Sequence, residues 1–160
     1  MKTASALLVV CLTAATVHAS VDPPLDLEKH TRGATKVVLA TVTDVGAAFG
    51  ENAYGDQLIL SRLTMRVDET LKGAHEAALV VILEGGTVGG VTLDVSDMPK
   101  LGRGQRAVLF LTSSPSGGYV PYGRGRGVVK VGADNRADGA DLTIDDIRAA
   151  VAAEKARGGR

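Results

Sequence analysis

The chain has 160 residues with 18 basic and 18 acidic side chains, which give a formal net charge of zero. This balance argues against a dedicated nucleic-acid-binding domain, because such a domain is usually clearly basic. Aromatic residues make up only 3% and Trp is absent, so stacking platforms for sugars or single strands are scarce. The length favours one domain with a core that needs no disulfide.

The first nineteen residues have the order of a secretory signal peptide. Lys2 gives a basic start, residues 4–15 are almost all apolar, and Val17-His18-Ala19 fits the small-residue pattern of a cleavage site. Cleavage after Ala19 predicts a secreted or periplasmic chain of 141 residues, with 17 basic and 18 acidic side chains. No second long apolar run follows, so we expect no membrane span.

Cys11 is the only cysteine of the chain and lies within this segment. The mature chain would therefore contain no disulfide. A lipoprotein signal would attach lipid to Cys11, but it requires a small residue just before the cysteine, and Val10 is branched and bulky. Ordinary cleavage is the favoured interpretation, and lipidation of Cys11 stays the alternative.

Residues 20–34 are polar, contain Pro23-Pro24 and show no periodicity, which predicts an extended lead-in. From residue 35 to residue 132, short apolar runs alternate with Gly, Pro and Asp, which predicts a β domain. The segments 78–84 and 105–112 each contain a continuous apolar run, at 79–83 and 107–111, which is typical of central strands. The expected strands are 36–45, 57–71, 78–84, 91–95, 105–112, 119–122 and 128–131, with a loop at 46–56.

Residues 133–160 change from strand to turn and then to helix. Thr143 and Asp146 have the spacing of a capping pair, and Ile144, Ile147 and Val151 recur at helical spacing. This pattern predicts a helix from Ile144 to about residue 155, packed at an edge of the sheet, and then a flexible tail. About seven strands and one helix predict a mainly β protein, either a sandwich or, favoured by the glycines, a small antiparallel OB-like barrel with a C-terminal helix.

The segment 36–131 resembles uncharacterised secreted bacterial proteins of OB-like barrel type, and it is similar to netrin-type modules. The similarity lies in a long strand that ends in Leu71-Lys72-Gly73 and in the run Gly104-x-x-x-Val108-Leu109-Phe110-Leu111. Netrin-type modules include the tissue inhibitors of metalloproteinases, so the resemblance implies protease inhibition through an amino-terminal cysteine that chelates zinc. The mature start would be Ser20-Val21-Asp22, so no functional residue is carried over.

The residues predict neither an enzyme nor a cofactor site. His30 and His75 are the histidines left after cleavage, and neither lies in a catalytic motif, so we expect solvated surface side chains. We interpret four carboxylates as solvent-exposed charges on a strand face and in its flanking turns rather than as paired catalytic carboxylates. They are Asp68, Glu69, Asp94 and Asp97.

A partial calcium-loop pattern starts at Asp134 and runs through Asp138-Gly139 to Asp145. Arg136 occupies a ligand position of that pattern, and a cation there opposes metal binding. We therefore expect an ordinary turn before the helix and no metal site.

Gly123-Arg124-Gly125-Arg126-Gly127 is the most unusual local string. Its arginines either bind an anionic group or face water on a hairpin whose glycines allow positive φ. The candidate ligand-binding residues are Arg124, Arg126, Arg103, Arg106, Tyr119 and Tyr122. The functional hypothesis is a secreted non-catalytic binding module for an extracellular protein or an anionic ligand, and the alternative is a secreted protease inhibitor.

Overall fold

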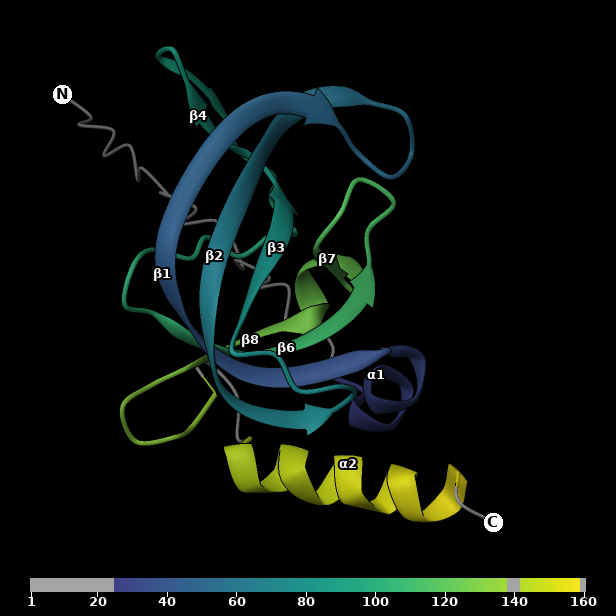
Figure 1. Cartoon of the computed structure of the whole chain (residues 1–160). Helices are drawn as coiled ribbons and strands as arrows, with labels where there is room; N and C mark the ends of the chain where they lie inside the picture. Colours follow the sequence, from purple (N-terminus) through teal and green to yellow (C-terminus); the bar gives the residue numbers. More distant parts are fainter. Residues whose placement is uncertain (1–24, 138–141, 159–160) are drawn as a thin grey trace, which may run out of the picture.

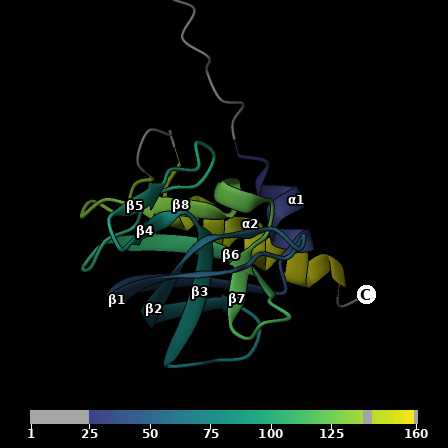
Figure 2. The same cartoon turned by 90° about the horizontal axis from the view of Figure 1, so that it is seen from above.

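The computed structural model describes residues 25–137 and 142–158. Six strands form one curled sheet in the spatial order β1-β2-β3-β7-β6-β8, and β1 also pairs with β6. The sheet therefore closes into a ring, which Figure 1 shows from the side and Figure 2 from above. The strands are β1 (Lys36–Glu51), β2 (Gln57–Lys72), β3 (Ala78–Glu84), β6 (Arg106–Ser113), β7 (Tyr119–Pro121) and β8 (Val128–Val131).

The ring has the strand order of an OB-like barrel. Its neighbours are antiparallel, except that β3 and β7 run parallel where Val81 pairs with Tyr119. β7 and β8 lie one after the other along the edge of β6 that faces away from β1. The predicted fold class, a mainly β barrel with a C-terminal helix, is confirmed.

Two apolar clusters explain why some strands are apolar on both faces. Val38 and Ala40 of β1 point into the barrel with the first cluster, whereas Val37 and Leu39 point outward into the second. The same alternation divides β6, whose Phe110 lies in the outer cluster. A strand buried on both faces is apolar throughout, which accounts for the continuous run at 107–111.

The lead-in contains a helix, α1 (Leu27–Gly33), where an extended segment was predicted. Its N-cap is Asp26, whose side chain accepts a hydrogen bond from the Lys29 amide at 2.9 Å. A helix of seven residues makes only about two turns, so it leaves no periodicity in the sequence. The cap was the one local signal of its start.

His30 is buried in α1, so its prediction as a solvated side chain was wrong. It is 5% exposed, and its ring lies edge-on to Phe110 and Tyr122, with centroid distances of 5.6 and 5.7 Å. Its Nδ1 bonds the Asp26 carbonyl oxygen at 2.8 Å. His75 is exposed beside Thr70, as predicted.

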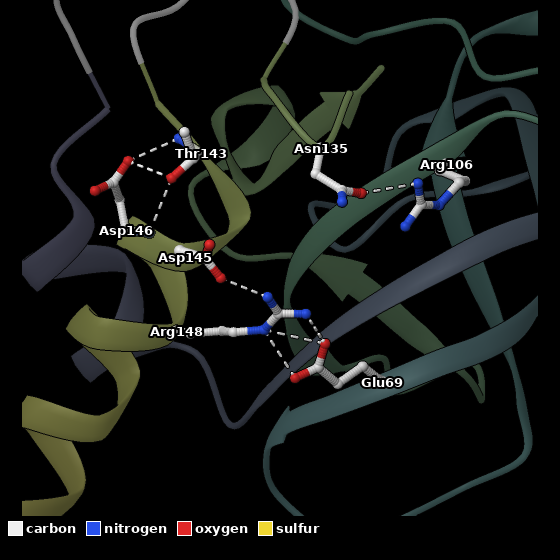
Figure 3. A network of polar contacts seen from close by, with 7 residues as sticks. All are labelled: Glu69, Arg106, Asn135, Thr143, Asp145, Asp146 and Arg148. Carbon is white, nitrogen blue, oxygen red and sulfur yellow. Dashed lines mark hydrogen bonds and ion pairs between the residues drawn. The ribbon is translucent and has the colours of Figure 1, made fainter. Parts of the chain in front are cut away.

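The C-terminal helix, α2 (Ile144–Gly158), starts at the predicted cap. The Asp146 amide donates to Thr143 Oγ1 at 3.2 Å, and the Thr143 amide donates to Asp146 Oδ2 at 2.8 Å (Figure 3). Ile144, Ile147 and Val151 join the outer cluster over β1 and β6, so α2 forms a core layer instead of packing at a sheet edge. Arg148 fixes the helix to β2, because its Nη2 bonds Glu69 Oε2 at 2.5 Å (Figure 3).

β1 continues through residues 46–51, where a loop was predicted, and pairs with β2 as far as Glu51 and Gln57. The small residues there suggested a loop, but one of them, Ala47, packs against the strand β4. A Cβ on Gly86 would lie 3.2 Å from the Ala47 Cβ. The true turn is short, and Asn52 organises it by accepting hydrogen bonds from the Tyr54 and Asp56 amides, both at 2.9 Å.

A second hairpin pairs β4 (Gly86–Val88) with β5 (Val91–Leu93). The sequence predicted a strand over 91–95 and chain breaks at the glycines on either side of β4. The strand β4 was therefore missed, because the glycine pairs enclose only Thr87 and Val88. Gly89 and Gly90 form the turn with φ of 57° and 82°.

Candidate functional site

The string Gly123-Arg124-Gly125-Arg126-Gly127 forms the 3-10 turn η1 (Arg124–Gly127) and not a hairpin. Its glycines are required by close backbone packing. A Cβ on Gly125 would lie 1.7 Å from the Asp97 carbonyl oxygen, and a Cβ on Gly127 would lie 2.3 Å from that of Tyr122. The motif is therefore a packing device that joins β7 to β8.

The guanidinium of Arg124 pairs with two carboxylates of the same chain. Its Nη2 contacts Glu84 Oε2 at 2.7 Å, and its Nε contacts Asp97 Oδ2 at 2.7 Å. The residue has φ of 60°, a left-handed conformation that non-glycine residues rarely adopt. The neighbouring Arg126 is exposed and makes no ion pair within the described part of the chain.

The other predicted arginines lie elsewhere. Arg103 forms an exposed ion pair with Asp44, and Arg106 Nη1 bonds Asn135 Oδ1 at 3.1 Å (Figure 3). Arg106 pairs with Val131, the last residue of β8, whereas η1 precedes the first. The structure does not bring the four arginines together.

The two predicted tyrosines serve the fold. The Tyr119 hydroxyl donates to Glu76 Oε1 at 2.5 Å, and the buried Lys36 Nζ lies 2.6 Å from the same oxygen and 5.4 Å from the Tyr119 ring centroid. The Lys36 ammonium, and then the Tyr119 hydroxyl, lower the pKa of Glu76 by hydrogen bonding. The Tyr122 ring covers His30 and lies so close to Gly33 that a Cβ there would be 2.1 Å from it.

The carboxylates considered at the sequence level each have a cationic partner of their own. Asp68 pairs with Arg66, Glu69 with Arg148, Asp94 with Lys100, and Asp97 with Arg124. Asp134 accepts a hydrogen bond from the Arg136 amide at 3.2 Å, as in an ordinary turn, while Asp138 and Gly139 lie outside the described residues. Among the residues that the structure describes, no three metal-ligating side chains gather.

A groove that the sequence did not indicate lies between the β1–β2 turn and the β6–β7 loop, and we name it the interaction groove. Its deeper part has a volume of about 80 Å³ and is lined by the outward side chains of Leu60 and Ile82, with Arg124 at one end. A shallower part of about 160 Å³ shares Leu60 and Ile82 and extends toward Phe49. Ser116 of the β6–β7 loop borders both parts.

Two strongly exposed aromatic side chains border the interaction groove. Phe49 is 66% exposed and Tyr54 is 72% exposed, although the whole chain has only two Phe and three Tyr. Aromatic side chains are enriched in interface cores and are unfavourable in water. The sequence did not indicate that these rings lie on an extended β1–β2 hairpin, because residues 46–56 were predicted as a loop.

A chain of polar contacts holds the walls of the groove together. Asn52 Nδ2 donates to Glu84 Oε1 at 3.1 Å, and Arg124 bridges Glu84 to Asp97. The β1–β2 turn, β3 and η1 are thereby tied into one frame. The lining at this end of the groove carries the carboxylates of Glu51 and Glu84 against the one guanidinium of Arg124, so the rim is acidic.

Comparison with protein-family models and with curated proteins gives no match for this chain. The class of the protein therefore rests on its fold, an OB-like barrel. The interaction groove lies over β2 and β3 of this barrel and beside the β1–β2 turn and the β6–β7 loop. Within the described ranges, no helix is long and apolar enough to cross a membrane.

The Arg124 contact predicts a specific acid sensitivity. The hydrogen bond from Arg124 lowers the pKa of Asp97, so this carboxylate stabilises the fold above the ordinary Asp pKa of about 3.9. That contribution is lost as the pH falls through the lowered pKa of the folded state. We expect the free energy of unfolding, measured by urea titration between about pH 4 and pH 2, to fall less steeply in Arg124→Gly than in the wild type. Arg126→Gly should keep the wild-type slope, and equal slopes in all three proteins would contradict the assignment.

Proposed function

We propose that the chain is a secreted, non-catalytic binding module that holds a partner protein at the interaction groove. The single observation that carries this proposal is the pair of strongly exposed rings, Phe49 and Tyr54, at a groove over β2 and β3. The fold gains nothing from exposing them, since the barrel fills its interior with aliphatic side chains.

The size of the groove supports a protein partner. A volume of about 80 Å³ suits a single side chain, which is how an anchor residue of a partner fills a pocket at the centre of an interface. Exposed aromatic rings around such a pocket exclude water from the contact. The acidic rim supports a partner that places basic residues beside its anchor.

An anionic ligand at the arginine turn has less support. Arg124 already pairs with Glu84 and Asp97, so an incoming anion would have to displace two carboxylates. Arg126 offers one exposed guanidinium, which is a weak anchor without a neighbour. The protease-inhibitor alternative stays a prediction that rests on fold analogy alone, because the mature chain lacks the amino-terminal cysteine that the resemblance implies.

The groove predicts that Phe49→Asp will weaken capture of the partner from the medium or envelope fraction at least tenfold. The substitution removes an aromatic contact and leaves a carboxylate that the interface would have to desolvate, while the fold keeps its core because Phe49 is exposed. Val91→Asp is the matched control, since Val91 is also an exposed apolar residue, 58% accessible, but lies on the β4–β5 hairpin and lines neither part of the groove. Equal loss in both variants would show nonspecific apolar adhesion and reject the groove.

Secretion has its own test. The intact mass of the protein from its own organism should correspond to a chain that begins at Ser20, recovered from the medium or the periplasm. A full-length cytoplasmic species, or lipid on Cys11, would remove the extracellular setting from the proposal.

A further inference from the structure

A second cavity lies at the mouth of the barrel, under the β4–β5 hairpin, and we name it the flap pocket. Its volume is about 240 Å³. Its floor consists of Leu63, Leu83 and Leu101, which belong to the barrel core and are 1%, 4% and 7% exposed. The cavity therefore opens directly onto the apolar interior. Glu84 and Met98 line both the flap pocket and the interaction groove.

The polar groups around the flap pocket already have partners. The Ser61 hydroxyl donates to the Gly85 carbonyl at 2.6 Å, and the Thr87 and Thr92 hydroxyls bond each other at 2.9 Å. At the rim, Lys100 Nζ contacts Asp94 Oδ2 at 2.7 Å. A ligand would thus meet apolar walls and saturated polar groups, and burying a charge or an unpaired donor there would be costly.

The hairpin over the pocket turns on two glycines. Gly85 and Gly86 have backbone φ angles of 102° and 135°, which residues with a side chain rarely adopt. A Cβ on Gly85 would lie 3.1 Å from the Leu93 carbonyl oxygen, and one on Gly86 would lie 2.6 Å from Ser61 Oγ. These glycines let β4 fold back against β1 and β2, so that β4 and β5 roof the cavity.

We propose that the flap pocket binds a small, uncharged, apolar molecule with one or two rings. An apolar cavity of about 150 Å³ in another protein binds benzene, and this one is larger. Barrel mouths are common sites for small ligands, and such sites are lined mainly by apolar side chains. The proposal does not depend on the proposed function, because the two sites share only Glu84 and Met98 of their linings.

The probe for this test is N-phenyl-1-naphthylamine, an uncharged dye whose fluorescence rises in apolar surroundings. We expect saturable binding to the full mature chain, weakened at least tenfold by Val95→Phe, which fills the pocket from its wall. Val91→Phe introduces the same ring four residues earlier, on β5 and outside the lining, so it should bind the dye as the wild type does.

Methyl NMR locates the dye and does not rely on a variant that might misfold. The methyl signals of the three floor leucines should shift in the wild type, whereas those of Leu60 and Ile82 in the interaction groove should not. Absence of saturable binding, shifts confined to the groove, or unchanged binding in a folded Val95→Phe would each overturn the proposal.

Discussion

Gly125→Ala should be the most damaging single substitution in the chain's arginine-containing turn. The new Cβ would lie 1.7 Å from the Asp97 carbonyl oxygen and 3.0 Å from Pro99 Cδ, so the backbone of η1 or of residues 97–99 must move. Such a shift would also separate Arg124 from its two carboxylates. We expect the free energy of unfolding, measured by urea titration, to fall by about 3 kcal/mol or more.

Gly46→Ala is the matched control for this substitution. Gly46 lies in β1 with no positive φ and with no atom within 4 Å of an added Cβ. Its replacement should leave stability within about 0.5 kcal/mol of the wild type. A small effect of Gly125→Ala would contradict the close packing of the turn against the Asp97 backbone.

Phe110→Ala should cost about 3 to 5 kcal/mol of stability, because it removes a fully buried ring from the cluster between the sheet and the helices. The His30 ring that packs edge-on against it would lose its support. The chain's other phenylalanine supplies the control, since Phe49 is 66% exposed. Phe49→Ala should change stability by less than about 0.5 kcal/mol. A large loss on Phe49→Ala would give that ring a structural role and weaken the proposed function.

The barrel could be predicted because strand patterning is a local signal. Continuous apolar runs marked the strands buried on both faces, and the Thr143 and Asp146 pair marked the start of α2. The errors fell where tertiary contacts override local composition. Ala47 of β1 packs against Gly86 of β4, although a run of glycine and alanine also fits a loop. The helix α1 was too short to show a period, and His30 is buried only because Phe110 and Tyr122 close around it.

The candidate site was harder to predict than the fold, because it depends on which distant segments meet. The sequence singled out Arg124, and the structure places it at one end of the interaction groove, but as a paired structural residue. The groove itself joins the β1–β2 turn, β3 and the β6–β7 loop, which are far apart in the sequence. The exposure of Phe49 and Tyr54 becomes informative only once the hairpin that carries them is known.

Site-specific photo-crosslinking tests the groove most directly. The analogue p-benzoylphenylalanine replaces Tyr54 at the groove or, in a second protein, the exposed Lys155 on α2, and each is produced in the native organism and irradiated. If a partner protein binds at the interaction groove, position 54 should give one discrete protein adduct. This adduct should disappear when Phe49→Asp is added, and position 155 should give none. Adducts of equal yield from both positions, or an adduct at position 54 that survives Phe49→Asp, would contradict it.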